Sequence, residues 1–98
     1  MDISKNENAG EITLSVNGRV DSKTAPQFEE RIKESLDAAE RMIIDLSGVN
    51  YISSAGLRVL LTAHKAMSAK DGLVIKNACN EVMAVFDVTG FSGVFNIE

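Results

Sequence analysis

The sequence contains no tryptophan, one cysteine, one proline, one tyrosine and four phenylalanines among its 98 residues. Because Cys79 has no second cysteine to pair with, the chain has neither a disulfide framework nor a thiolate cluster for a metal ion. This cysteine usage is typical of a reducing compartment. With so few aromatic residues, we expect a core built mainly from Val, Ile, Leu, Met and Ala.

Long apolar runs are also missing. No run approaches the roughly 18 residues of a membrane span, and Met1–Asn8 lacks the charged-then-apolar pattern of a signal peptide. Lys and Arg number 10 against 14 Asp and Glu, so the net charge of -4 argues against a general affinity for nucleic acid or anionic membranes. We therefore expect a cytoplasmic protein with a single domain over residues 1–98.

What the chain does contain is periodic apolar patterning. Alternation on both sides of Ala9-Gly10 predicts a hairpin over residues 2–8 and 11–18, whose core face carries Ile12, Leu14 and Val16. Ser22–Pro26 has the hydroxyls and the proline of a helix start. The helix that follows repeats apolar residues at four-residue spacing, namely Phe28, Ile32, Leu36 and Ala39.

The second half of the chain alternates strands and helices. Arg41–Leu46 has the continuous apolar run of a strand covered on both faces. We then expect a helix over residues 54–70 ended by Asp71-Gly72, a strand over residues 73–76, a helix capped by Asn80 and ended by Gly90, and a strand over residues 94–97. This order predicts an α/β domain with a mixed sheet, an N-terminal hairpin and right-handed βαβ crossovers.

The usual catalytic patterns are absent, so we expect no enzyme, no cofactor and no metal site. His64 lies ten residues beyond Ser54 on the same predicted helix, about 15 Å along its axis, and cannot act as a base for that serine. No G-x-S-x-G, phosphate-binding glycine loop or metal-ligand spacing occurs. We interpret His64 as a partly buried, hydrogen-bonded helix residue and Cys79 as a small buried or loop residue.

Ser53 and Ser54 stand at the start of the second predicted helix. Backbone N–H groups in a first helical turn have no partner inside the helix, and the helix dipole favours negative charge there. A phosphate added at this point would be tolerated electrostatically. The alternative is that both serines are ordinary capping residues, with Gly48 in a turn and Gly56 in close packing. Spacing alone leaves both interpretations open.

Three segments resemble the STAS domain of bacterial anti-sigma factor antagonists. Gly18–Pro26 is similar to the family segment G-x-[LV]-D-x-x-[TN]-A, and Asp45–Leu57 resembles D-L-S-x-V-x-[FY]-[MI]-[DS]-S-[STA]-G-L. Val82–Phe91 is similar to the closing helix of the family and its L-T-G-L turn. Together with the predicted elements, these segments extend the resemblance over nearly the whole chain and imply the STAS fold.

The resemblance also implies a function in transcription regulation. It implies an antagonist that binds a serine-kinase anti-sigma factor, frees the sigma factor, and is inactivated when that kinase phosphorylates the helix start. A PP2C-type phosphatase would reset it. The partners are proteins rather than nucleic acid or membrane, and we expect a monomer when the protein is free. The implied binding face comprises Asp21, Thr24, Ser53, Ser54, Ala55, Gly56 and Arg58.

Two departures from the family pattern shape these expectations. Ala55 occupies the position of the usual phosphoacceptor, which leaves Ser54 as the first choice and Ser53 as the second. The alternative to phosphorylation at either serine is that the chain is a constitutive STAS subunit, which docks on a transporter ATPase or in a signalling complex. Members of the family usually continue past the last strand into another helix, which is expected to be absent or trimmed here because the chain stops at Glu98.

Two residues of this face keep a second interpretation. Asp21 and Thr24 also suit the capping of the first helix. Arg58 suits either an ion pair with a phosphate on Ser54 or a solvent-exposed helix position.

Overall fold

The computed structural model describes residues 1–98 and contains one mixed five-stranded sheet with the strand order β1-β2-β3-β4-β5. β1 and β2 form the predicted antiparallel hairpin, and every later neighbour in the sheet pairs in parallel. The predicted mixed α/β architecture is therefore confirmed. Its elements are β1 (Asp2–Asn8), β2 (Glu11–Asn17), α1 (Ala25–Leu36), β3 (Arg41–Gly48), α2 (Ser54–Met67), β4 (Leu73–Lys76), α3 (Asn80–Thr89), the 3-10 turn η1 (Phe91–Gly93) and β5 (Asn96–Ile97).

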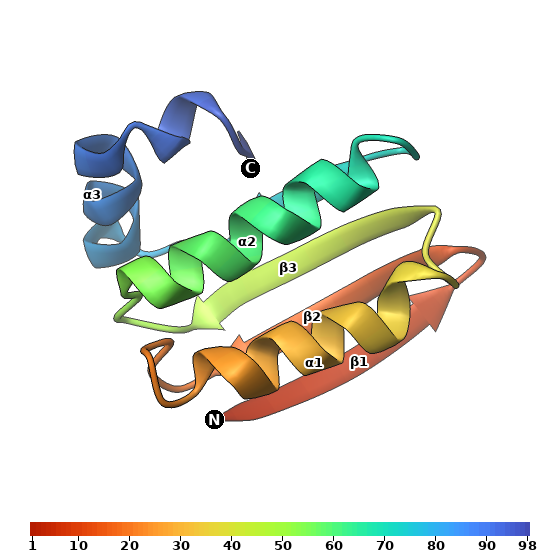
Figure 1. Ribbon diagram of the computed structural model, residues 1–98, viewed down its shortest axis with the longest axis horizontal. Helices are drawn as coiled ribbons and strands as arrows, with labels where there is room; N and C mark the ends of the chain where they lie inside the picture. Colours follow the sequence, from red (N-terminus) through yellow and green to blue (C-terminus); the bar gives the residue numbers. More distant parts are fainter.

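Helices α1 and α2 lie side by side over one face of the sheet, and α3 stands near the end from which α2 starts (Figure 1). The predicted core positions Ile12, Leu14 and Val16 are fully or almost fully buried in the cluster beneath these helices. No helix of the structure combines the length and apolar character needed to cross a membrane.

The prediction that the strand at residues 41–46 is covered on both faces was wrong for its second face. Ile43 pairs with Val74 of β4, and both are buried but lie outside the main core cluster. Arg41 and Asp45 are only half-buried on the same side of β3. Neighbouring side chains, rather than a layer of helices, therefore shield the apolar residues of this face.

The first helix is shorter than its apolar spacing predicted. It ends at Leu36, so Ala39 is buried outside the helix, and Ser35 rather than Leu36 completes the buried stripe. Lys70 Nζ donates hydrogen bonds to the carbonyl oxygens of Leu36 at 2.6 Å and Ala39 at 2.7 Å. Because this lysine satisfies carbonyls at the helix end, the chain can turn toward β3 there.

The other two helices differ from prediction at one end each. Helix α2 ends at Met67 instead of Lys70, because Gly72, at a φ of +97°, turns the chain so that its N–H donates to the Met67 carbonyl. In α3 the capping position is Cys79, and Asn80 is already the first helical residue. Gly90 ends α3 in the left-handed conformation, as predicted.

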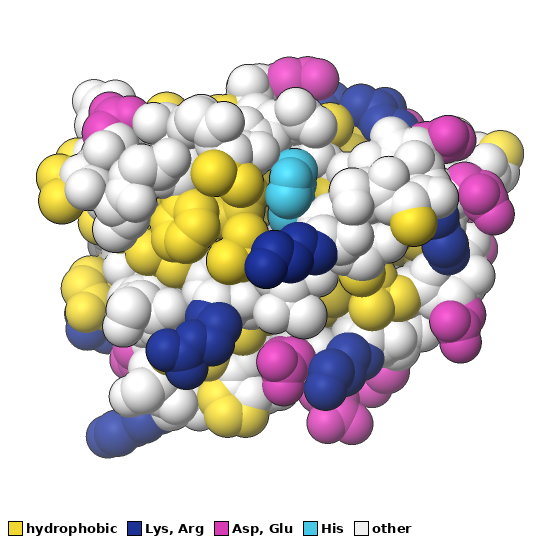
Figure 2. All heavy atoms as spheres, turned by 45° about the horizontal axis from the view of Figure 1, so that its top comes forward, with side chains coloured by type: hydrophobic (Ala, Val, Ile, Leu, Met, Phe, Trp, Pro, Cys, Tyr) yellow, Lys and Arg dark blue, Asp and Glu magenta, His cyan; other side chains and the backbone are white.

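An aromatic cluster closes the C-terminal part of the fold. The Phe95 ring packs edge-on against Phe86 and His64 and is stacked on Phe91. Apolar side chains gather beside the single histidine on the molecular surface (Figure 2). The prediction that His64 is hydrogen-bonded is not supported at Nδ1, which is buried without a hydrogen-bond partner. The packing of the His64 ring against Phe95 explains the position of His64 instead.

The outer strand β1 is tied to α1 by side chains of the helix. Arg31 Nη1 donates to the Ile3 carbonyl at 2.9 Å, and Gln27 Nε2 donates to the Met1 carbonyl at 3.3 Å. Edge strands otherwise present unpaired backbone groups to solvent. These two contacts engage acceptors at the start of the outer edge.

Candidate functional site: two helix starts at one end of the sheet

The starts of α1 and α2 lie at the same end of the molecule, beyond the carboxyl ends of β2 and β3 (Figure 1). A short parallel bridge between Val20 and Ile52 joins the loops that lead into them. In this bridge the Val20 N–H donates to the Tyr51 carbonyl at 3.0 Å, and the Ser53 N–H donates to the Val20 carbonyl at 2.8 Å. The two sequence motifs, 31 to 33 residues apart at these contacts, thus form one surface.

Gly56 allows α2 to lie against this bridge. It is buried in the first turn of the helix, and a Cβ added to it would lie 2.5 Å from Val20 Cγ1 and 2.8 Å from Ile52 Cγ1. Such separations are far below van der Waals contact, so any side chain would push the helix away from the two loops. The glycine of the motif is therefore explained by close approach.

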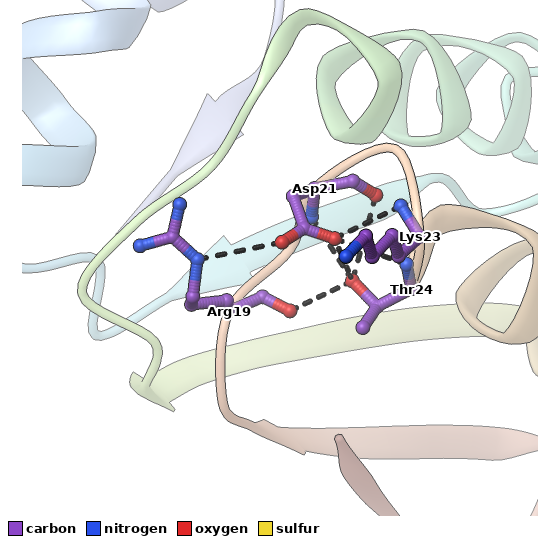
Figure 3. A network of polar contacts seen from close by, with 4 residues as sticks. All are labelled: Arg19, Asp21, Lys23 and Thr24. Carbon is purple, nitrogen blue, oxygen red and sulfur yellow. Dashed lines mark hydrogen bonds and ion pairs between the residues drawn. The ribbon is translucent and has the colours of Figure 1, made fainter.

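Asp21 and Thr24 form a closed hydrogen-bond network before α1 (Figure 3). Asp21 Oδ1 accepts from the N–H groups of Lys23 at 3.0 Å and Thr24 at 3.1 Å. Thr24 Oγ1 accepts from the Asp21 N–H at 2.9 Å and donates to the Arg19 carbonyl at 2.8 Å. The structure thus brings together the two residues predicted from this motif, and their side chains hold the loop before α1. The alternative prediction that they cap the helix is not supported, because Thr24 stands at the capping position but its side chain makes no hydrogen bond to the N–H groups of α1.

The electrostatics of Asp21 follow from this network. The N–H of Thr24 stabilises the charged carboxylate most strongly, and the N–H of Lys23, the Arg19 side chain and the Thr24 hydroxyl add to it. These hydrogen bonds outweigh desolvation and lower the pKa of Asp21 below its ordinary value of 3.8. Asp21 is consequently ionised at neutral pH.

The start of α2 is built differently. Ser53 is the capping residue, but its Oγ is buried and makes no hydrogen bond. Ser54 is exposed at the first helical position, and the first turn contains no acidic residue. The free N–H groups of this turn therefore face no carboxylate of their own helix.

Ala55 and Arg58 extend the surface toward α1. Arg58 is exposed and forms no ion pair within the chain, and it lies one helical turn beyond Ser54 at the i+4 position. Both residues line an open depression of about 230 Å³ between the two helix starts, together with Ser22, Ala25, Pro26, Glu29 and Val59.

Sequence reasoning did not select two residues of this surface, Arg19 and Tyr51. The Arg19 guanidinium carbon lies 4.0 Å from the centroid of the Tyr51 ring, which is a cation–π contact between the two loops. Both side chains are exposed, Tyr51 at 41%. The available signal was the single tyrosine of the chain, placed in the loop just before the two serines.

Comparison with known proteins agrees with this geometry. The family model described as "STAS domain" matches residues 2–98. A putative anti-sigma factor antagonist, BtrV of Bordetella bronchiseptica, is 36% identical over 90 residues, which cover 90% of this chain and 78% of the relative. The anti-sigma-B factor antagonist of Listeria monocytogenes is 30% identical over 97 residues, covering 96% of this chain and 84% of the relative.

A solved structure of an anti-sigma factor antagonist has a similar fold. The crystal structure of an anti-sigma factor antagonist from Mycobacterium paratuberculosis superposes with a TM-score of 0.89 at 25% identity, covering 98% of this chain and 83% of that one. The chain belongs to the STAS domain family, and its relatives named here are anti-sigma factor antagonists, which are regulatory proteins.

Proposed function

We propose that this protein is an anti-sigma factor antagonist that works as a phosphorylation-controlled partner switch. The coarse function is supported by relatives of that name that align over most of the chain. The switch is supported by one observation above the others, the exposed hydroxyl-bearing Ser54 on the first turn of α2. In this proposal the unphosphorylated surface binds a serine-kinase anti-sigma factor, and a PP2C-type phosphatase restores it after phosphorylation.

Phosphorylation of Ser54 would penalise complex formation more than folding. A phosphoryl group adds about 1.5 to 2 negative charges and three acceptor oxygens at pH 7. In the free protein the N-terminal end of α2 stabilises that charge, and Arg58 at i+4 is available as a cation. In the complex the same charge must be desolvated or face partner groups, so binding weakens while the fold persists.

The two serines differ in access. The Ser53 hydroxyl oxygen is buried, whereas Ser54 is exposed, and a kinase must place the hydroxyl oxygen in line with the γ-phosphorus of ATP. Ser54 is therefore the proposed phosphoacceptor, and Ser53 serves as the capping residue.

The experiment is a kinase reaction with site mapping. A purified serine-kinase anti-sigma factor from the same organism is incubated with this chain and ATP, and phosphate is located by mass spectrometry. We expect phosphate on Ser54, no phosphate on the Ser54→Ala variant, and normal phosphorylation of Ser53→Ala. Binding of Ser54→Asp to the kinase should be weakened relative to Ser54→Ala. Phosphate on another residue, or equal affinity of both variants, would contradict the switch at Ser54.

A second candidate function is favoured by Ala55. Because the usual acceptor position has no hydroxyl, the chain suits a constitutive STAS subunit of a transporter ATPase or signalling complex. In that case the kinase reaction yields a stable complex without phosphate transfer, or no complex at all. The same experiment therefore separates the two candidates.

A further inference from the structure

The outer side of the loop pair carries a preorganised arginine. Arg19 Nε donates to Asp21 Oδ2 at 3.4 Å while the guanidinium lies against the Tyr51 ring. Asp21 is itself held by the N–H groups of Lys23 and Thr24. Arg19 is thus fixed from two sides although its side chain is 61% exposed.

The terminal nitrogens of this arginine remain available. The Arg19 side chain makes no hydrogen bond within the chain other than the one from Nε, so both terminal NH₂ groups keep their donors. A planar guanidinium with two free parallel donors matches a carboxylate in two-point geometry. Holding the side chain in place beforehand also lowers the entropy lost when a partner binds.

Tyr51 supplies the apolar part of the same feature. It is one of three large apolar side chains that are exposed, and it lies three residues before Ser54. Tyrosine and arginine are the residue types most enriched among the residues that dominate binding energy at protein interfaces. The other two exposed apolar residues, Val88 and Val94, lie in the C-terminal part of the fold.

An open groove of about 440 Å³ runs beside Arg19. The residues that line it include Arg19, Glu81 of α3 and the segment Ser47–Asn50. A partner segment that fits this groove carries a carboxylate toward Arg19 and hydrogen-bond donors toward Glu81. This pattern of charge fits an exposed protein segment.

From these contacts we infer that Arg19 and Tyr51 anchor the anti-sigma partner, with the Arg19 guanidinium binding an Asp or Glu side chain of that partner. The inference rests on the proposed function and names the chemistry of recognition at the same surface. It also explains how a phosphate on Ser54 would weaken the complex. The phosphate, three residues beyond Tyr51, would repel the partner carboxylate that Arg19 attracts.

The test measures the affinity of the full chain for a purified serine-kinase anti-sigma factor from the same organism. Arg19→Glu should lower the affinity about a hundredfold or more, because it replaces an attraction by a repulsion. Tyr51→Ala should lower it about tenfold. Lys5→Glu, an equal charge change at an exposed position of β1, is the matched control and should leave it within about twofold. Urea unfolding checks that all variants fold.

Salt dependence gives a second readout. The affinity of the wild-type protein should fall as salt rises, and the fall should be shallower for Arg19→Ala because one close charge pair is lost. If the wild-type protein binds the kinase and the Arg19 and Tyr51 variants bind equally well, the inference is overturned and the proposed function stands. If the wild-type protein does not bind the kinase, the proposed function fails and the anchor fails with it.

Discussion

The starts of α1 and α2 share one end of the molecule, but their polar groups are arranged in opposite ways. Before α1, the Asp21 carboxylate and the Thr24 hydroxyl are engaged in several hydrogen bonds. At α2, the Ser53 hydroxyl makes none, and no acidic residue stands in the first turn. The first arrangement satisfies backbone groups of the loop that leads into α1, whereas the second leaves the capping hydroxyl unused and the N–H groups of the first turn of α2 open to an anion from outside.

Within this surface, the α1 start therefore supports the structure, and the α2 start is the candidate binding position. The α1 start fixes the loop that carries Arg19, and the bridge from Val20 to Ile52 transfers that fixed position to the α2 start. The α2 start, where the Ser53 hydroxyl makes no hydrogen bond, can therefore be held in place by the α1 start. We expect loss of the Asp21–Thr24 hydrogen bonds before α1 to change stability, and a change of charge at Ser54 of α2 to change binding more than stability.

The largest effect should come from filling the contact between the two starts. Gly56→Ala places a methyl group against Val20 and Ile52, and overpacking of this kind costs about 2 to 3 kcal/mol of unfolding free energy. Urea unfolding measures the change. Gly93→Ala is the control, because no heavy atom lies within 4 Å of the added methyl group and the effect should stay near zero. Equal stability of both variants would show that the bridge does not require the glycine.

A direct comparison of the two starts uses their hydroxyls. Thr24→Val keeps the shape of the side chain but removes the hydrogen bonds to the Asp21 N–H and the Arg19 carbonyl, which should cost about 1 kcal/mol. Ser53→Ala removes a hydroxyl that makes no hydrogen bond, so unfolding free energy should change by less than about 0.5 kcal/mol. Chemical denaturation of both variants tests the contrast, and a larger loss in Ser53→Ala would reverse it.

A negative charge should act differently on the fold and on binding. Ser54→Asp puts a carboxylate in the first turn of α2, where none exists, and should raise the unfolding free energy by about 0.5 kcal/mol. The gain should shrink at high salt because the charge is exposed. Thermal unfolding at two salt concentrations measures it. A destabilised Ser54→Asp variant would show that the α2 start does not accept an anion.

The smallest effect concerns acid stability. Hydrogen bonds from Thr24 and Lys23 lower the pKa of Asp21 in the folded protein below 3.8, so the unfolded chain takes up a proton first as pH falls. The stabilisation is fully present above pH 3.8 and is lost as pH falls through the folded pKa. The unfolding free energy of Asp21→Asn should therefore fall less steeply than that of the wild-type protein as pH is lowered. Urea unfolding of Asp21→Asn and of the wild-type protein at a series of acidic pH values measures the difference, and equal slopes would contradict it.

Much of the fold followed from the sequence because its periodic signals are local. The hairpin around Ala9-Gly10 and the left-handed cap at Gly90 depend on residues that are neighbours in the chain. The end of α1 could not be predicted in this way, because it depends on Lys70, more than thirty residues away. The same holds for His64, whose ring packs on Phe95 from the far end of the chain.

The site followed only in part for the same reason. The motifs selected Asp21, Thr24 and Gly56, each of which contributes to the local structure of its own loop or helix. The contact of Arg19 with Tyr51 joins two loops and has no local signature. Nor does spacing reveal that Ser53 and Ser54, adjacent in sequence, differ in the access of solvent to their hydroxyls.

The contacts of α1 with β1 bear on how copies of this protein behave toward each other. A strand from a second molecule that approached the outer edge near Ile3 would find that carbonyl already bound by Arg31. Pairing there would first require breaking a charge-assisted hydrogen bond, which raises the barrier to edge-to-edge aggregation. Contacts between copies through this edge are therefore disfavoured, while the surface at the starts of α1 and α2 stays free of such contacts.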